Sequence, residues 1–275
     1  MKENLTWILE QTRFANDHNV AQRLGYIVQE FGNEVITFKT APTGANDFSF
    51  LDEIPSPAIY YGGMNSFFEI RATCKYIPHP FGWYNSKTFS CTTYYKTLKP
   101  FILQENHLFT TPQLLSEERE PIFDTLGQDA CIFVRSNDNE KNVSGQLLKW
   151  EDVDIFLRTI KGYNQFPDDG EIVVAEPLVI KAEWRFVVVN DKVVNGSLYK
   201  QDNFIKSSPD FPMEALELAQ KAIDHWSPAV ICVIDIALVE DDYKVIEIGP
   251  FNYAGLYECD LYKIVSSINS YFFPC

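Results

Sequence analysis

The sequence of 275 residues predicts a small α/β unit at the N-terminus, followed by a larger α+β region. The first 75 residues alternate strand-like and helix-like runs, an order typical of a small parallel sheet. From residue 130 onward, strand-like runs follow one another across short polar turns, a pattern that favours antiparallel pairing. With 46% hydrophobic residues, the chain can bury a large core in two or three subdomains of one body.

The N-terminal unit is defined by four runs. We expect strands at "LTWILEQT", "EVITFK" and "PAIYYGG", and a helix at "NVAQRLGYIVQEFG" that ends in Gly32. The composition then changes to a segment rich in aromatic residues and proline, beginning with "KYIPHPFGWYN". We therefore predict an N-terminal α/β domain over residues 1–80 and a second domain over residues 81–275, with subdomains at about 81–168 and 169–275.

The second domain is predicted in chain order. "TTPQLLSEEREPIFDTLG" resembles a capped helix leading into the strand "ACIFVRSN", and "EDVDIFLRTIKGY" has the acidic start and apolar period of a helix. "EIVVAEPL", "AEWRFVVVN" and "KVVNGSLYK" are expected strands, the last two joined by a tight turn at Asn190 and Asp191. The helix "PMEALELAQKAIDHW", two further strands and a terminal helix complete the chain.

Composition excludes several classes of function. A formal net charge of −15 argues against binding to a nucleic-acid backbone or to an anionic membrane, which needs clustered lysine and arginine. The six cysteines show no CxxC spacing, so we expect reduced thiols and a cytoplasmic protein. No apolar run is long enough for a membrane span, and the polar N-terminus does not resemble a signal peptide.

Two acids lie inside the apolar strands near the C-terminus. "AVICVIDIALV" holds Asp235, and "YKVIEIGPFNYAG" holds Glu247, with Asn252 just behind it. A hairpin across "VEDDYK" would place both carboxylates on one surface, and a buried carboxylate needs compensation that a divalent cation can supply. Oxygen ligands with an amide suit Mg²⁺, which suggests phosphate chemistry. The alternative is that Asp235 ends a strand and Glu247 faces solvent on an edge strand.

The order of these runs resembles the ATP-grasp superfamily over about residues 90–275. The resemblance rests on a strand with an arginine, a polar loop with lysine and glycine, "AEPL", "EWRF", "VIDIAL" and "VIEIGPFNYAGLY", and extends to uncharacterised bacterial and phage proteins. It implies an ATP-grasp fold, in which two α+β subdomains clamp ATP after a small α/β domain. The implied cofactors are ATP and Mg²⁺.

The resemblance implies phosphate contacts from a basic pair. Arg135 in "FVRSN" and Lys141 in "EKNVSG" match the family's cations, and Gly145 would let a loop backbone approach phosphate closely. The alternative is an arginine at a strand end and a solvated loop lysine. The segment "VVAEPL" resembles a hinge where main-chain groups of Glu176 and Leu178 bracket adenine, although Pro177 could equally just end an edge strand.

In "EWRF", Glu183 and Arg185 lie two residues apart and therefore project from one strand face. The family places an arginine at this position beside the transferred phosphoryl group, so Arg185 is the predicted catalytic residue together with Lys141, and Glu183 joins the nucleotide site. The alternative is an exposed cross-strand salt bridge. Tyr199 and Lys200 end the next strand, where the family has a substrate contact.

The resemblance also implies that Asp235, Glu247 and Asn252 hold Mg²⁺. Here the chain departs from the family, which usually has asparagine two residues after the glutamate, where this chain has Gly249. Either Asn252 enters the site from a loop, or water replaces the third ligand. Gly255 and Tyr257 resemble a loop that shapes the acceptor site, or they only turn the chain into its last helix.

The resemblance predicts an ADP-forming, ATP-dependent carboxylate–amine or carboxylate–thiol ligase that works through an acylphosphate. The partners would be ATP, a small-molecule or peptide carboxylate and an amine, and a homodimer is left open. Two alternatives are an ATP-grasp small-molecule kinase and a nucleotide-binding or interaction protein with weak turnover. The sequence does not identify the acceptor.

Overall fold

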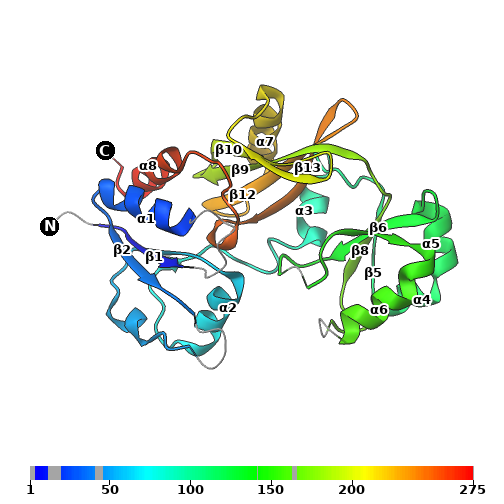
Figure 1. The fold of residues 1–275 in the computed structure, drawn as a ribbon, viewed down its shortest axis with the longest axis horizontal. Coiled ribbons are helices and arrows are strands. Elements are labelled where there is room, and N and C mark those ends of the chain that lie inside the picture. Colours follow the sequence, from blue (N-terminus) through cyan, green and yellow to red (C-terminus); the bar gives the residue numbers. More distant parts are fainter. Residues whose placement is uncertain (1–3, 12–19, 41–45, 141, 163–165, 275) are drawn as a thin grey trace.

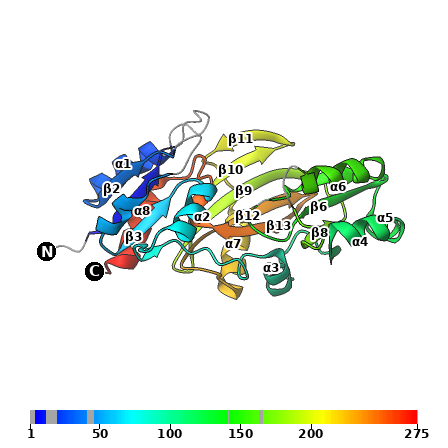
Figure 2. The ribbon, with the colours of Figure 1, turned by 90° about the horizontal axis from the view of Figure 1, so that it is seen from below.

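The computed structural model describes residues 4–11, 20–40, 46–140, 142–162 and 166–274, and these residues form three β-sheets. The sheets follow one another in space: the N-terminal sheet lies at one end, the large sheet in the middle and the small sheet at the other end (Figures 1 and 2). We propose that residues 1–80 are the N-terminal domain and residues 81–275 the second. The last strand of the N-terminal sheet extends one residue further, to Phe81, and the small sheet extends to Ala175, beyond the subdomain boundary expected near residue 168.

The N-terminal sheet has the strand order β2-β1-β3-β4, and its pairs are parallel, as the β–α–β order predicts. Its strands are β1 (Thr6–Glu10), β2 (Glu34–Phe38), β3 (Ala58–Tyr61) and β4 (Pro80–Phe81). Helices α1 (Val20–Glu30) and α2 (Met64–Thr73) and the 3-10 turn η1 (Ser49–Glu53) connect them. Gly32 has φ of 77°, a backbone conformation that favours glycine, and it follows α1 as predicted.

The small sheet is antiparallel, with the order β5-β8-β6-β7. Its strands are β5 (His107–Thr110), β6 (Cys131–Ser136), β7 (Gln146–Lys149) and β8 (Ile172–Ala175). Helices α4 (Pro112–Glu117), α5 (Arg119–Leu126) and α6 (Val153–Gly162), with the turn η2 (Trp150–Asp152), pack against it (Figure 1).

The predicted capped helix near residue 115 is two helices. Thr111 caps the first by accepting a hydrogen bond from Leu114 N, as the sequence suggests. The chain turns at Glu118 and restarts, so that Pro121 falls in the first turn of α5. Proline is tolerated in a first turn, where its missing N–H has no helical partner, but not in the interior of a continuous helix.

The large sheet is also antiparallel, with the order β11-β10-β9-β12-β13. Its strands are β9 (Ile180–Val189), β10 (Lys192–Gln201), β11 (Phe204–Ser208), β12 (Ile231–Val239) and β13 (Asp242–Pro250). Asn190 and Asp191 have φ of 48° and 61°, the left-handed conformation of a two-residue hairpin turn, and this confirms the predicted turn.

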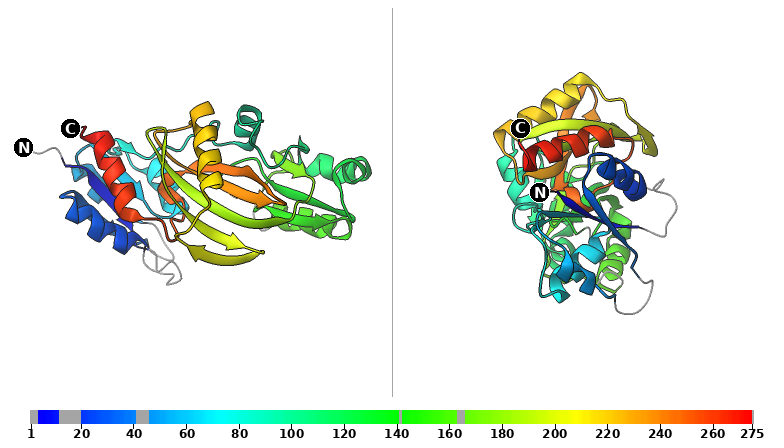
Figure 3. Two further views of the ribbon diagram at one scale, coloured as in Figure 1. Left: turned by 90° about the horizontal axis from the view of Figure 1, so that it is seen from above. Right: turned by 90° about the vertical axis from the view of Figure 1, so that its left-hand side faces the viewer.

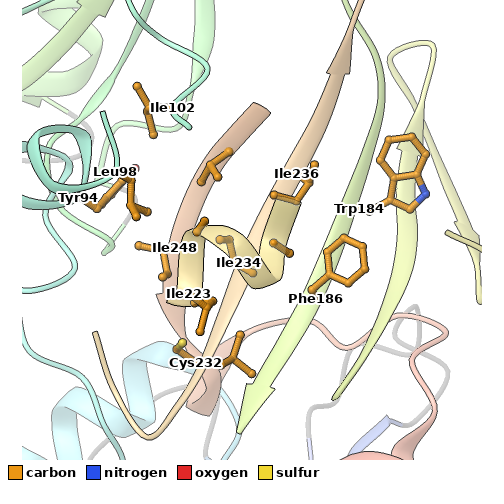
Figure 4. Packing of buried hydrophobic residues seen from close by; sticks show 14 of the residues in the cluster. Tyr94, Leu98, Ile102, Trp184, Phe186, Ile223, Cys232, Ile234, Ile236 and Ile248 are labelled. Carbon is orange, nitrogen blue, oxygen red and sulfur yellow. The ribbon is translucent and has the colours of Figure 1, made fainter. Parts of the chain in front are cut away.

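One face of the large sheet carries the main hydrophobic core. Trp184, Phe186, Ile234, Ile236 and Ile248 alternate along three strands and pack beneath α7 (Met213–His225) and α3 (Cys91–Thr97) (Figure 4). Because side chains on a strand alternate between faces, the residues between these point to the opposite side of the sheet. Those intervening residues include both embedded acids.

The opposite face of the large sheet is partly covered by the N-terminal domain and by α8 (Leu261–Phe272). Val187, Val233 and Phe251 share a buried cluster with α8 and with α1, and Figure 3 shows α8 alongside α1. The turn η3 (Phe251–Tyr253) joins β13 to this layer. The two acids lie on this same face of the sheet, next to the part that the N-terminal domain and α8 cover. Among the described residues, no helix is long and apolar enough to cross a membrane.

We expect stability to fall steeply above pH of about 10. Burial raises the pKa of Tyr60, Tyr94 and Tyr95 above that of an ordinary phenol. Because the pKa is raised in the folded state, the unfolded chain loses these protons at a lower pH than the folded protein does. The contribution of these tyrosines to the free energy of unfolding is therefore complete below the unfolded pKa and is lost as pH rises above it. Urea unfolding across alkaline pH measures this, with tyrosinate absorbance as a second signal. Ionisation of all 14 tyrosines at pH of about 10 in protein with native circular dichroism would contradict it.

Candidate functional site

The hairpin of β12 and β13 brings the two embedded acids together. Asp235 lies directly opposite Glu247, and on its other side it lies opposite Arg185 of β9. Residues opposite each other in antiparallel strands share a face, so this row of three side chains crosses the sheet. The predicted hairpin, with both carboxylates on one surface, is confirmed.

The Asp235 carboxylate is buried and paired with a guanidinium. Its side chain is 4% exposed, and Arg185 donates two hydrogen bonds to it, from Nε to Oδ1 at 2.8 Å and from Nη2 to Oδ2 at 2.7 Å. This fork geometry is the strongest arrangement between arginine and a carboxylate. The sequence predicted that a metal ion compensates this charge; in the structure, Arg185 compensates it.

Arg185 itself is held in place by its surroundings. Its Nη1 donates to the Gly255 carbonyl at 3.3 Å, and its guanidinium carbon lies 5.6 Å and 5.5 Å from the ring centres of Tyr199 and Tyr257. These two rings stack on each other at 5.0 Å with an interplanar angle of 12°. Gly255 and Tyr257, predicted to shape the acceptor site, therefore contact the predicted catalytic arginine.

Glu183, Tyr199 and Lys200 form a hydrogen-bonded group beside this pair. Tyr199 Oη donates to Glu183 Oε2 at 2.6 Å, and Lys200 Nζ lies 2.8 Å from Oε1 of the same carboxylate. Burial, reinforced by the charges of Asp235 and Glu183, raises the pKa of Tyr199 well above its usual value. Tyr199 is therefore a protonated hydrogen-bond donor at neutral pH. The alternative of a cross-strand salt bridge is borne out in that Glu183 pairs with Lys200 on the neighbouring strand, but Glu183 is 8% exposed, so the pair is not the exposed one expected.

Glu247 connects the large sheet to the small one. Nη2 of Arg135, at the end of β6, lies 3.5 Å from Glu247 Oε2, and the two side chains are 9% and 14% exposed. Gly145 lies in the loop that leads back to β7, where an added Cβ would come within 4.0 Å of Arg135 Cβ. Lys141, the second predicted phosphate contact, lies outside the described residues.

Glu176 and Leu178 lie in the connection between the small and large sheets. The Glu176 carboxylate accepts hydrogen bonds from Asn106 Nδ2 at 3.1 and 3.2 Å, and its main-chain N–H donates to Asn106 O at 3.4 Å. The alternative of an edge strand ending at Pro177 is wrong, because β8 pairs with β5 on one side and β6 on the other. These hinge residues are not among those lining the cavity at the acids.

The structure gives Asn252 a role different from the predicted one. Its side chain is fully buried, its Nδ2 donates to Tyr60 O at 2.6 Å and to Phe81 O at 3.1 Å, and its Oδ1 accepts from Trp83 N at 3.1 Å. These bonds hold η3, which follows β13, to β3 and β4 of the N-terminal sheet and to Trp83 just after it. The prediction that Asn252 completes a metal site is therefore corrected: its polar atoms hold main-chain groups and do not line the cavity.

We expect Asn252→Ala to lower the free energy of unfolding by about 2–4 kcal/mol, because it leaves buried main-chain groups without partners. Asn106→Ala removes an exposed amide that bonds Glu176 and is the matched control, with an expected loss below about 0.5 kcal/mol. Urea denaturation measures both. Equal stability of the two variants would contradict the joining role of Asn252.

A cavity with a volume of about 360 Å³ opens over the acids. Its lining includes Arg185, Asp235, Glu247, Gly249 and Asn139. Asn139, in the loop after β6, is a site residue that the sequence does not predict, because nothing local separates it from the other polar residues of "NDNEKN". Within the described ranges no group of three or more histidine, cysteine, aspartate or glutamate side chains could hold a metal ion. Two carboxylates with an amide oxygen nevertheless suit the hard cation Mg²⁺.

Two antiparallel sheets meet at paired acids and arginines, after a parallel N-terminal sheet, and this arrangement agrees with the ATP-grasp fold that the resemblance implies. The model of the family described as "ATP-grasp domain, R2K clade family 2" matches residues 118–266, more than half of the chain. The chain therefore belongs to that family, and the predicted superfamily and fold are confirmed.

Solved structures support the same fold. D-cycloserine synthetase DcsG superposes with a TM-score of 0.66 at 10% identity, covering 98% of this chain and 99% of that one. D-alanine–D-alanine ligase from Bacillus anthracis, complexed with ATP, gives 0.59 at 12% identity, with 98% and 92% covered. N5-carboxyaminoimidazole synthetase from Staphylococcus aureus, complexed with ADP, gives 0.58 at 12% identity, with 92% and 71% covered. A comparison with curated proteins found no match.

Proposed function

We propose that this protein is an ATP-dependent ligase that joins a carboxylate to an amine, releasing ADP and phosphate. One observation carries the proposal: Arg185, Asp235 and Glu247 line one cavity from three strands of the large sheet, and Arg135 of the small sheet lies 3.5 Å from Glu247. Acids beside fixed guanidinium groups suit a reaction that brings several anions together. The solved structures named above include ligases and synthetases, in agreement with this class.

The proposed reaction has two steps. A carboxylate oxygen of the substrate attacks the γ-phosphorus of ATP, the bond to the β-phosphate oxygen breaks, and ADP leaves with that electron pair. The amine nitrogen then attacks the carbonyl carbon of the acylphosphate, inorganic phosphate leaves, and the amine releases a proton. No side chain of the protein forms a covalent bond, so its work is positioning and charge neutralisation.

The roles follow from where the side chains lie. Arg185 would hold the phosphoryl group and the substrate carboxylate, and its pairing with Asp235 and the Tyr199–Tyr257 stack fixes its direction. Arg135 and Lys141 would contact phosphates, with Gly145 near Arg135, and main-chain groups of Glu176 and Leu178 would contact adenine. Asp235 and Glu247 would hold Mg²⁺, which when bound offsets the charge of the β- and γ-phosphates.

The substrates are proposed by class. We propose an amino acid or a short peptide as the carboxylate, because the rings of Tyr199 and Tyr257 lie against Arg185, and the Lys200 ammonium lies beside Tyr199 on the shared partner Glu183. This agrees with neighbours named as a D-alanine–D-alanine ligase and as the ATP-grasp ligase PsnB complexed with a minimal precursor.

The test is to incubate the protein with ATP, Mg²⁺ and a pooled set of amino acids and peptides, following ADP, inorganic phosphate and product masses. A ligase gives equal amounts of ADP and phosphate, a product lighter by one water than the two substrates, and no turnover with EDTA. ADP without phosphate, together with a phosphorylated product, would identify a kinase. Nucleotide binding without ADP would identify a binding protein.

A further inference from the structure

Asn139 presents its amide oxygen to the cavity in a fixed orientation. The side chain is 4% exposed, and its Nδ2 donates to Phe89 O at 3.2 Å and to Ile248 O at 3.0 Å. Because main-chain carbonyls only accept hydrogen bonds, the amide cannot be flipped without losing both. Among the described residues, no hydrogen-bond donor reaches its Oδ1. The residue lines the cavity together with Asp235 and Glu247.

Gly249 provides the space in which this oxygen lies. A Cβ added at Gly249 would come within 3.2 Å of Asn139 Oδ1. Gly249 is two residues after Glu247 on β13, so such a Cβ would lie on the same face as the Glu247 side chain. Its backbone is outside the positive-φ region. Residue 249 therefore favours glycine because the Asn139 amide lies so close. The amide oxygen of Asn139 lies next to the space that a side chain at residue 249 would fill.

We propose that Asn139 is the third protein ligand of the divalent cation, supplying from the small-sheet loop an oxygen beside Asp235 and Glu247. The inference rests on the proposed function. A neutral amide adds a hard oxygen ligand without adding negative charge, which suits a site where Asp235 already binds Arg185. The ligands then come from both antiparallel sheets, so that cation binding fastens the small sheet to the large one.

The test uses Mn²⁺ as a spectroscopic probe in place of Mg²⁺, with a non-hydrolysable ATP analogue at saturation, and measures free Mn²⁺ by electron paramagnetic resonance. Asn139→Ala is expected to weaken Mn²⁺ binding by at least about 10-fold, as is typical when a metal site loses an oriented group. Gly249→Ala removes no polar group, yet its methyl would press on Asn139 Oδ1, so it is expected to weaken binding in the same direction.

The double variant Asn139→Ala/Gly249→Asn moves the amide from the loop to the strand, and its Mn²⁺ affinity is expected to recover toward that of the wild type. Asn195→Ala is the control for loss of a buried amide: its Oδ1 accepts from Asp260 N at 2.6 Å, and it does not line the cavity. This variant should bind Mn²⁺ normally. Melting temperatures report the folding of each variant.

The inference is overturned if Asn139→Ala and Gly249→Ala, both folded, bind Mn²⁺ as tightly as the wild type. It is also overturned if Asn195→Ala weakens binding as much as Asn139→Ala does, since the effect would then be one of general stability. If the wild-type protein binds neither the analogue nor Mn²⁺, the proposed function itself fails. In contrast, if the wild type binds Mn²⁺ and the two variants bind it equally tightly, only the role of Asn139 fails and the proposed function stands.

Discussion

Glu247→Gln is expected to reduce the rate of ADP formation by at least about 100-fold while the protein stays folded. Glutamine keeps the shape of the side chain but removes the charge that would hold a cation beside Asp235. The carboxylate lies 3.5 Å from Arg135 and is 14% exposed. We therefore expect a loss of only about 1–2 kcal/mol in the free energy of unfolding.

The matched control is Glu105→Gln. Glu105 is a 60% exposed carboxylate, and its Oε1 lies 2.6 Å from Nζ of Lys244. Lys244 is in β13, the strand that also holds Glu247. Its loss should leave both the ADP rate and the stability nearly unchanged, because exposed ion pairs contribute little. The measurement is coupled detection of ADP at saturating ATP, Mg²⁺ and acceptor, alongside urea denaturation. An ADP rate in Glu247→Gln within a fewfold of the wild type would rule out a role for this carboxylate in turnover.

Local patterns were sufficient to predict much of the acid-bearing face. The alternation of side chains along a strand placed Glu183 and Arg185 on one side, and the polar turn "VEDDYK" predicted the hairpin that sets Asp235 opposite Glu247. Both rules depend only on residues that are near each other in the sequence. These rules could not predict the pairing of Asp235 with Arg185. The two residues are far apart in the sequence, and they meet because β9 and β12 are neighbours in the strand order of the large sheet.

The third ligand shows why a site cannot be completed from sequence spacing alone. Asn252 is close to Glu247 in the chain, yet its amide holds main-chain groups of the N-terminal sheet. Asn139 lies more than a hundred residues before Glu247, and the packing of two sheets brings it to Gly249. Sequence separation carries no information about such a contact. The only local signal is Gly249 itself, which departs from the family pattern of asparagine at this position.

Arg185→Met is expected to be the most damaging single substitution at the site. It leaves the Asp235 carboxylate, 4% exposed, without its guanidinium partner, and removing one member of a buried pair costs about 3–5 kcal/mol. Asp235→Asn should cost a similar amount, because it leaves the buried charge of Arg185 uncompensated. Both variants should also lose ADP formation, since one lacks the proposed phosphoryl contact and the other a proposed cation ligand.

The double variant Arg185→Met/Asp235→Asn separates stability from chemistry. With both charges gone, no buried ion is left unpaired, so the double variant should be more stable than either single variant, and the coupling energy in the double-mutant cycle should exceed the loss in either single variant, about 3–5 kcal/mol. ADP formation should not return, because neither the guanidinium nor the carboxylate is restored. Urea denaturation and ADP detection on the four proteins give both quantities. A double variant that is stable and active would show that the pair only holds the fold together, whereas strictly additive losses of stability would show that the two side chains do not depend on each other.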